Sequence, residues 1–156
     1  MKFIGIRKRV RRDNLMRPSF FLALIIIISL NTFARSQCLR CEPNVVTLKG
    51  TVYAKDFPGP PNYESIRRGD ERMRYWILRL KKPICVEGDD FDNARIANVR
   101  ELQLVFRDAS FYSRYRRYVQ RRVPIRVVGS LFHQQTGHHV TKILIKVKTF
   151  APLRGL

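Results

Sequence analysis

Five stretches of the chain place apolar residues at every second position. Four of them keep the alternation throughout, and the fifth is interrupted by Leu144. Because successive side chains of a strand point to opposite faces, this period predicts β-strands with one apolar face. The predicted strands cover residues 46–54, 75–86, 101–106, 123–131 and 142–148. Gly50 lies inside the first strand and predicts a bend or bulge there.

One helix is expected between the third and fourth strands. Its apolar residues recur at helical spacing and share one face: Phe111, Tyr112, Tyr115, Tyr118 and Val119. Basic residues fall on another face: Arg114, Arg117 and Arg121. Ser110 is expected to cap the first turn, and the Val123-Pro124 pair to end the helix. At this spacing the tyrosines are expected to pack in the core rather than to stack on bases.

The predicted order of elements is strand, strand, strand, helix, strand, strand. This is the order of the OB-fold, a five-stranded barrel. The sequence therefore predicts a mainly β, five-stranded OB-like barrel over residues 45–150, with one helix between strands 3 and 4 and a tail at 151–156. Two irregular connections are expected, a proline-rich loop at 57–71 and a polar link at 87–98.

The first 36 residues have the pattern of a secretory signal. Basic residues precede a short apolar run at 20–28, and Ala34-Arg35-Ser36 offers small residues one apart. The run is shorter than the roughly 20 residues that span a bilayer, although a retained membrane anchor is the alternative. We therefore expect an N-terminal signal helix at 1–36, starting at Met1 or Met16, and an extension at 37–44 that precedes the barrel. The protein is expected to be exported, either periplasmic or secreted, with no transmembrane span in the mature chain.

The chain is strongly basic. Its formal net charge is +19, and without residues 1–36 it keeps 23 Lys and Arg against 11 Asp and Glu, a net charge near +12. Such a surface favours anionic partners, namely nucleic acid, anionic lipid head groups or acidic polysaccharide. The alternative is that the charge only keeps a small exported monomer soluble.

Three cysteines, Cys38, Cys41 and Cys85, predict one disulfide and one leftover thiol in an exported protein. Cys38 and Cys41 have the spacing of a redox motif, but no helix start follows to depress a thiol pKa. A zinc site would need further ligands. We favour a disulfide between the N-terminal segment and Cys85, with Cys38 preferred as its partner. The remaining thiol either stays reduced or links to another chain.

All three histidines lie in one predicted hairpin, His133 to His139. A four-residue link would place His133 opposite His138, with β-carbons about 5 Å apart. Those two imidazoles and a carboxylate from Glu64 or Asp70 could bind zinc or copper. The alternative, which we favour, is that the histidines hydrogen-bond backbone groups and stiffen the loops. We therefore predict no cofactor and keep zinc or copper as the less favoured alternative.

Several strings of residues resemble the DUF4431 family, small exported bacterial proteins of unknown function. They are Phe57-Pro58-Gly59-Pro60-Pro61-Asn62-Tyr63-Glu64-Ser65-Ile66, Gly69-Asp70-Glu71, Tyr75-Trp76, Pro83-Ile84-Cys85-Val86, Gly129-Ser130-Leu131-Phe132-His133 and Thr136-Gly137-His138-His139. The resemblance covers roughly residues 43–148 and implies a bacterial source and an OB-like barrel, but no activity. Cys41 departs from the family pattern, which leaves Cys38–Cys85 as the implied disulfide.

In an OB barrel the loops after strands 1 and 4 flank the usual binding face. Here these are the proline-rich loop and the histidine hairpin, so we expect them to meet at one end of the barrel. The candidate ligand-binding residues are Tyr63, Glu64, Arg67, Asp70, His133, Thr136, His138 and His139.

The predicted function is that of an exported binding module for an anionic ligand or envelope component. No nucleophile or base has a recognised spacing from a partner, so an enzyme is not favoured. The alternatives are a metal-dependent (zinc or copper) hydrolase and a single-stranded nucleic-acid-binding protein, the latter disfavoured by export.

Overall fold

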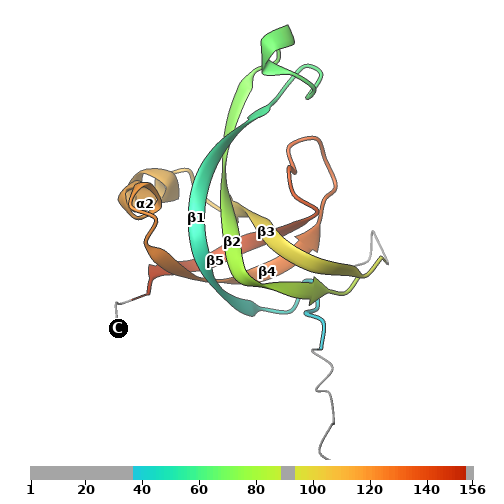
Figure 1. Ribbon diagram of the computed structural model, residues 1–156, viewed down its shortest axis with the longest axis vertical. Coiled ribbons are helices and arrows are strands. Elements are labelled where there is room, and N and C mark those ends of the chain that lie inside the picture. The colour runs from blue at the N-terminus through green and yellow to red at the C-terminus, as the bar shows by residue number, and fades with distance from the viewer. Residues whose placement is uncertain (1–36, 89–93, 154–156) are drawn as a thin grey trace, which may run out of the picture. The chain divides into compact units, whose positions relative to one another are not determined.

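A closed five-stranded barrel forms the part of the chain that the computed structural model describes, residues 37–88 and 94–153 (Figure 1). The elements are β1 (Val46–Pro58), η1 (Ile66–Arg68), β2 (Arg72–Val86), β3 (Ile96–Phe106), α2 (Ser110–Gln120), β4 (Pro124–His133) and β5 (Ile143–Pro152). Around the barrel the strands follow the order β1-β2-β3-β5-β4. The mainly β barrel with one helix between strands 3 and 4 is thus confirmed, while the predicted signal segment lies outside the described residues.

Pairing is antiparallel throughout the barrel except between β3 and β5, which run parallel. The long strand β1 pairs with β4 over residues 46–51 and with β2 over residues 50–58. Gly50 belongs to both ladders, and neither shifts register there, so no bulge lies at this position. Of the predicted bend or bulge only the bend remains, and Figure 1 shows β1 strongly curved. A β-carbon at Gly50 would collide with the carbonyl oxygen of Arg79, which explains the glycine.

Register shifts occur elsewhere in the barrel. One lies between β4 and β5, where Val128 pairs with Thr149 and Gly129 with Val147, so that Lys148 of β5 is skipped. Two more lie between β2 and β3, on either side of Ile84. A β-carbon at Gly129 would collide with the carbonyl oxygen of Lys146. An irregularity of this kind bends a strand locally, and small barrels need such bends to close.

The core lies inside the barrel and consists of the apolar positions of all five strands. Those with at most 1% exposure include Val52, Leu78, Leu102, Ile125 and Ile145. Aromatic side chains of α2 and the strand ends extend this core, since the Trp76 ring lies 5.0 Å from that of Tyr112 and 6.2 Å from that of Phe150. The tyrosines of α2 therefore pack in the core as predicted.

Leu144 breaks the alternation of β5 because both faces of this strand are buried at that point. It lies across from Gln103 in β3 and Phe132 in β4, on the outer side of the barrel. The β4–β5 loop, residues 134–142, packs there through hydrogen bonds to the Gln103 side chain. All of Ile143, Leu144 and Ile145 are consequently fully buried.

Helix α2 begins at Ser110, but its cap differs from the prediction. The Asp108 carboxylate accepts hydrogen bonds from both the Ser110 amide (2.9 Å) and the Ser110 hydroxyl (2.8 Å). A carboxylate at this position satisfies a free amide and favours the positive end of the helix dipole. Asp108, rather than Ser110, therefore supplies the side-chain cap.

The strands are longer than their alternation alone indicates. β1 continues to Pro58, β2 already begins at Arg72, β3 begins at Ile96, and β5 continues to Pro152. The irregular part of the proline-rich segment is therefore residues 59–71. Ala151 and Pro152 of the predicted tail are still paired with β4.

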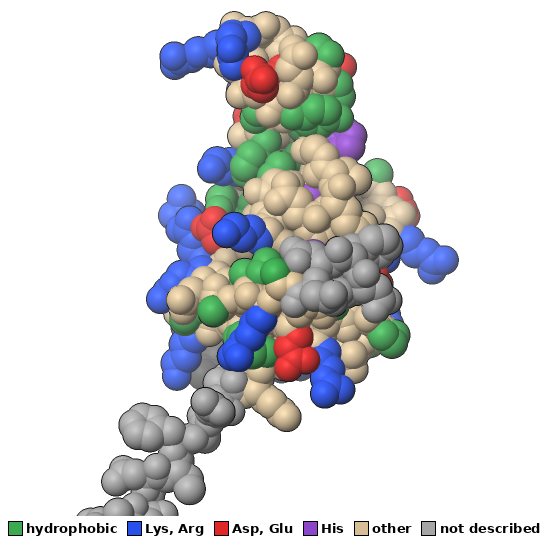
Figure 2. Space-filling view, turned by 90° about the vertical axis from the view of Figure 1, so that its right-hand side faces the viewer, with side chains coloured by type: hydrophobic (Ala, Val, Ile, Leu, Met, Phe, Trp, Pro, Cys, Tyr) green, Lys and Arg blue, Asp and Glu red, His purple; other side chains and the backbone are tan. Residues whose placement is uncertain are grey.

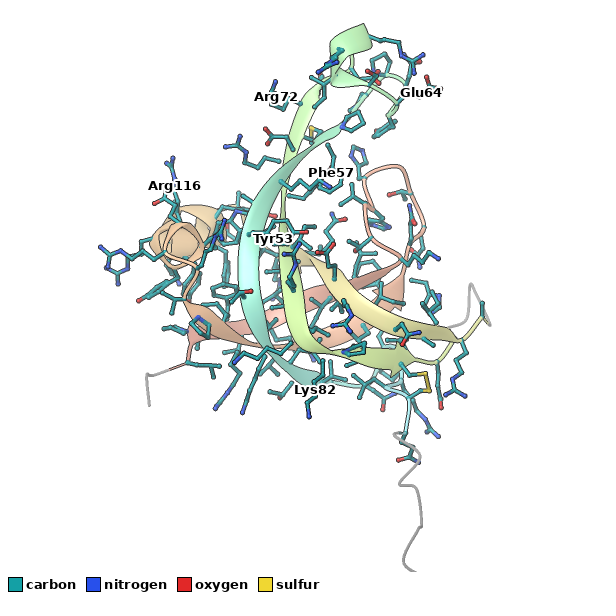
Figure 3. The ribbon with its side chains drawn as sticks, viewed as in Figure 1. Tyr53, Phe57, Glu64, Arg72, Lys82 and Arg116 are labelled. Carbon is teal, nitrogen blue, oxygen red and sulfur yellow. A yellow bond between two sulfur atoms is a disulfide. The ribbon has the colours of Figure 1, made fainter. Side chains whose placement is uncertain are left out.

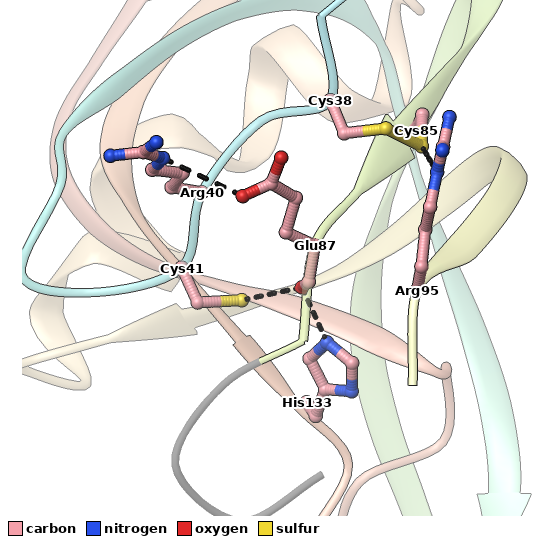
Figure 4. Close-up of a disulfide and its surroundings, with 7 residues drawn as sticks. All are labelled: Cys38, Arg40, Cys41, Cys85, Glu87, Arg95 and His133. Carbon is pink, nitrogen blue, oxygen red and sulfur yellow. Dashed lines mark hydrogen bonds and ion pairs between the residues drawn. A yellow bond between two sulfur atoms is a disulfide. The ribbon is translucent and has the colours of Figure 1, made fainter. Parts of the chain in front are cut away.

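The disulfide Cys38–Cys85 ties the N-terminal extension to the end of β2 (Figure 4). The backbone supports it, because Leu39 donates to the carbonyl of Cys85 at 2.8 Å and its own carbonyl accepts from Glu87 at 2.9 Å. The Cys41 thiol is buried and donates to the carbonyl oxygen of Glu87 at 3.6 Å. The same carbonyl oxygen lies 3.0 Å from Nε2 of His133, so the thiol and the imidazole both contact the chain just after β2.

Residues 36–156 form one compact unit, which contains the barrel, its core and the disulfide. Within the described part of the chain, no helix has the length and apolar character needed to cross a membrane.

Candidate ligand-binding site

The β1–β2 loop and the β4–β5 loop meet at one end of the barrel, as expected. The Tyr63 hydroxyl lies 3.0 Å from Nε2 of His138, and the two rings pack edge to face with centroids 5.2 Å apart. The backbone of the second loop also approaches the first, since a β-carbon on Gly137 would lie 3.2 Å from the Tyr63 ring. Two segments more than 70 residues apart in the sequence thus form a single rim.

Asp70 organises the β1–β2 loop from within. Its buried carboxylate accepts hydrogen bonds from three backbone amides, those of Asn62 (3.0 Å), Glu64 (2.8 Å) and Ser65 (2.7 Å). The pKa of Asp70 is lowered, first by the amide of Ser65 and then, against some desolvation, by the other two. These amides flank Tyr63, which has a left-handed backbone (φ 59°), so Asp70 fixes the direction in which Tyr63 points.

Gln103, on the outer side of β3, anchors the β4–β5 loop. Its side-chain nitrogen donates to the carbonyl of His138 at 3.0 Å, and its side-chain oxygen accepts from the amide of Val140 at 2.7 Å. Gln103 is only 4% exposed, so both bonds are shielded from water. This glutamine therefore determines where the backbone of His138 lies relative to the sheet.

His139 braces the same loop from the other side of the backbone. Its Nδ1 accepts from the amide of Gln135 at 2.9 Å, and its ring meets that of Phe132 edge to face. Burial and then the neighbouring His138 lower the pKa of His139, which keeps its imidazole neutral near pH 7. The carbonyl of Thr136 accepts from the amide of His139 at 3.0 Å, so Thr136 contributes to the loop through its backbone.

His138 also reaches strand β2. Its Nδ1 lies 3.3 Å from the hydroxyl of Tyr75, while its Nε2 lies 3.0 Å from that of Tyr63. A neutral imidazole has one donor and one acceptor nitrogen, so one hydroxyl donates to the ring and the other accepts from it. His138 thereby joins both loops and the sheet at one exposed point.

The outer face of β1 and β2 between these loops carries half-exposed aromatic side chains. Tyr53, Lys55 and Phe57 occupy every second position of β1 and therefore share this face. Tyr75 lies opposite Lys55 on β2. The rings of Phe57 and Tyr75 are 6.1 Å apart. In Figure 3 the Phe57 side chain lies between β1 and the β4–β5 loop, and Tyr53 lies further down the same strand. We call Tyr53, Lys55, Phe57 and Tyr75 the aromatic face.

Cationic side chains lie over two of these rings. The Lys55 ammonium is 4.9 Å from the centroid of Phe57, and the Arg79 guanidinium is 4.8 Å from that of Tyr53. Glu101 accepts from Arg79 at 2.8 Å and from the Tyr53 hydroxyl at 3.0 Å. Burial and then Glu101 raise the pKa of Tyr53, which keeps its hydroxyl protonated. Lys55, by contrast, makes no ion pair within the described residues and remains available to an anion.

Other predicted site residues lie apart from this face. Glu64 pairs with Arg68 at 2.8 Å at the exposed tip of the loop, and Arg67 is exposed beside it. His133 is 2% exposed and pairs across the ladder with Ile143. The predicted four-residue link is therefore wrong, because nine residues, 134–142, join the strands and His133 does not face His138.

That register removes the geometric basis for a metal ion shared by His133 and His138. Glu64 and Asp70, the carboxylates proposed to complete such a site, are engaged with Arg68 and with backbone amides. Across residues 37–88 and 94–153, no three or more His, Cys, Asp or Glu side chains gather closely enough to hold one metal ion.

Sequence reasoning placed the site in the loops and omitted the strands between them. Lys55 and Phe57 belong to the aromatic face together with the two tyrosines, and Arg79 lies over the Tyr53 ring. The sequence pattern could have revealed them, because residues two apart share one face of a strand and the odd-numbered residues of β1 and β2 form this face. Figure 2, which views the molecule from the side of the β4–β5 loop, shows a histidine at the surface just below the β1–β2 loop.

No curated protein matches the chain. A family model does match, over residues 101–151, which include the second half of β3, α2, β4 and almost all of β5. This range is shorter than the resemblance at 43–148 that the sequence predicted, and it includes the β4–β5 loop with His138. The matched family is DUF4431, a domain of unknown function, which confirms the family resemblance seen in the sequence.

Proposed function

We propose that this chain is an exported binding module that holds an anionic glycan of the cell envelope across its aromatic face. The observation that carries the proposal is the row of half-exposed rings, Tyr53, Phe57 and Tyr75, bounded by the two loops that meet at His138. Rings of this kind pack against the faces of sugars, and the loops that join strands 1 and 2 and strands 4 and 5 flank the face by which OB-folds bind oligosaccharides and oligonucleotides. The disulfide Cys38–Cys85 is consistent with an oxidising, exported location.

Lys55 supplies the preference for an anion. Its ammonium lies over the Phe57 ring and forms no ion pair within the described residues. Its charge helps to lower the pKa of Glu101, but that carboxylate is bound by Arg79. Arg79, in contrast, is neutralised by Glu101. A carboxylate or phosphate on the ligand would therefore find its charge partner at Lys55, while the rings contact the apolar faces of the sugar units.

The test measures binding of alginate, an anionic polyuronate, with neutral dextran as the uncharged comparison. Tyr53→Leu removes a ring of the aromatic face and is expected to weaken alginate binding several-fold. Lys55→Gln is expected to weaken alginate binding several-fold. Lys49→Gln removes an equal charge from an exposed lysine near the start of the same strand and is expected to have little effect. Equal binding of alginate and dextran, or equal effects of the two lysine variants, would contradict the proposal.

A second candidate is single-stranded nucleic acid, which the same rings favour because every base has a face to stack. The two candidates differ in their response to a competitor. An oligothymidylate that displaces alginate, and binds more tightly than alginate at equal salt, would assign the aromatic face to nucleic acid instead.

A further inference from the structure

Helix α2 has an unpaired cationic face that the aromatic face does not explain. Arg114, Arg117 and Arg121 follow one another at spacings of three and four residues, so they share one side of the helix. All three are exposed. No acidic residue occurs in the helix, and none of the three guanidinium groups forms an ion pair within the described residues. Arg114 does help to lower the pKa of Asp108, but that carboxylate is bound by the amide and hydroxyl of Ser110. We call these three residues the arginine stripe.

Aromatic rings border the arginine stripe. Phe111, Tyr115 and Tyr118 are half-buried, with neighbouring ring centroids 5.8 Å and 6.2 Å apart. The Arg117 guanidinium lies 4.9 Å from the centroid of Tyr118 and donates to its hydroxyl at 3.0 Å. Arginine and tyrosine side chains each have an apolar body and a polar tip. Side chains of this kind are common where a protein contacts the interface of a membrane.

The position of α2 leaves the stripe accessible. In Figure 1, α2 and the β4–β5 loop lie on opposite sides of β1, so a ligand on the aromatic face would not cover the helix. Figure 3 shows side chains projecting from α2 away from the barrel, Arg116 among them. The stripe lies on the exposed surface of a helix, which suits a broad partner better than a narrow chain.

We propose that the arginine stripe docks the protein on an anionic phospholipid surface. Guanidinium groups bind phosphate oxygens in pairs, which suits phospholipid head groups. The same groups could contact nucleic-acid phosphates, but the neighbouring rings are not available for stacking on bases. Tyr115 packs against Phe150 with centroids 4.8 Å apart, and Phe111 stacks on Phe106 with centroids 5.4 Å apart. This inference does not depend on the function proposed for the aromatic face.

The expected strength follows from the number of arginines. A basic side chain near an anionic membrane surface strengthens binding by about fivefold at physiological salt. Three of them are therefore expected to contribute about a hundredfold. Because these interactions are screened, the contribution is expected to shrink as ionic strength rises.

The experiment measures cosedimentation of the chain starting at Gln37 with phosphatidylcholine vesicles, with and without phosphatidylglycerol. This start leaves out the apolar run at 20–28, and residues 36–156 form a compact unit. The test variant is Arg114→Gln, Arg117→Gln and Arg121→Gln together. The matched control is Lys49→Gln, Lys81→Gln and Lys82→Gln, which removes equal charge from exposed lysines of β1 and β2. A third variant replaces the three arginines with lysine, and thermal unfolding confirms that each variant is folded.

Binding to phosphatidylglycerol vesicles is expected to fall about a hundredfold in the arginine-to-glutamine variant and severalfold at most in the lysine control. The arginine-to-lysine variant keeps the charge but loses the paired phosphate contacts, so it is expected to bind more weakly than the unaltered chain and more tightly than the arginine-to-glutamine variant. Equal losses in the two glutamine variants would show that only net charge matters and would overturn the proposal. Absence of binding to charged vesicles would overturn it as well. Oligonucleotide binding that depends on the same three arginines, with no preference for charged vesicles, would assign the stripe to nucleic acid.

Discussion

The Tyr63 hydroxyl and Nε2 of His138 lie 3.0 Å apart, although 75 positions separate the two residues in the chain. This contact closes the rim above the aromatic face, and the second nitrogen of the same imidazole lies 3.3 Å from the hydroxyl of Tyr75. Each loop therefore limits the movement of the other. The geometry of the proposed site should depend on both loops together.

A double-mutant cycle should detect this coupling. Tyr63→Phe removes the hydroxyl but keeps the ring, and it is expected to lower the free energy of unfolding by about 0.5–1.5 kcal/mol. In the background of His138→Ala the same change should cost much less, because the partner is already missing. Urea unfolding of the four proteins gives the coupling energy.

Tyr118→Phe serves as the control for this cycle, since its hydroxyl bonds to Arg117 and not to the loops. Its effect is expected to add to that of His138→Ala within about 0.5 kcal/mol. Additive behaviour of Tyr63→Phe as well would mean that the loops do not support one another.

Asp70→Asn should loosen the β1–β2 loop. The amide group of asparagine would place a donor against amides that now donate to the carboxylate, namely those of Glu64 and Ser65. A melting temperature lowered by several degrees and faster hydrogen exchange at residues 62–65 are expected. Glu71→Gln, the exposed neighbouring change, should leave both measurements unchanged. Protection of these amides in Asp70→Asn equal to that in the unaltered chain would contradict the role assigned to Asp70.

The same carboxylate predicts how stability depends on pH. The backbone amides lower the pKa of Asp70 below its ordinary value of 3.8, so the folded chain binds this proton less readily than the unfolded chain does. The stability contributed by Asp70 is therefore complete above about pH 4 and is lost as the pH falls through the lowered pKa. Unfolding measured from pH 7 to pH 2 should show the difference between the unaltered chain and Asp70→Asn shrinking below pH 4. A difference that stays constant over this range would contradict the assignment.

The sequence was sufficient to predict the barrel and the end at which its loops meet, because alternation and element order both follow from where side chains must point. It was not sufficient for the register of His133, since the length of the β4–β5 loop depends on the anchor that Gln103 provides from another strand. The role of Asp70 was missed for a similar reason. A carboxylate in a polar loop looks like a ligand until its backbone partners are known.

Gly129→Ala should destabilise the barrel at the register shift between β4 and β5. The added β-carbon would meet the carbonyl oxygen of Lys146, which belongs to the paired strand and cannot move without breaking the ladder. A loss of about 1–3 kcal/mol in the free energy of unfolding is expected. Gly137→Ala is the comparison, because its β-carbon would meet the Tyr63 ring at 3.2 Å, which a side chain can relieve. Equal losses in the two variants would show that β4 tolerates the extra carbon.

Reduction of the disulfide Cys38–Cys85 should cost about 4 kcal/mol, since the bond closes a loop between residues 47 apart. The double variant Cys38→Ser and Cys85→Ser is expected to show the same loss in urea unfolding, without any reductant. Cys41→Ala is the control, because its buried thiol is outside the disulfide and donates to the carbonyl of Glu87, and about 1 kcal/mol is expected there. Thiol labelling gives an independent readout. The folded chain should label slowly, and the unfolded chain without reductant should react at one cysteine, because Cys41 alone of the three cysteines is outside the disulfide. Labelling at three cysteines in the unfolded, unreduced protein would show that the bond does not form, and the N-terminal extension would then depend on its backbone bridge alone.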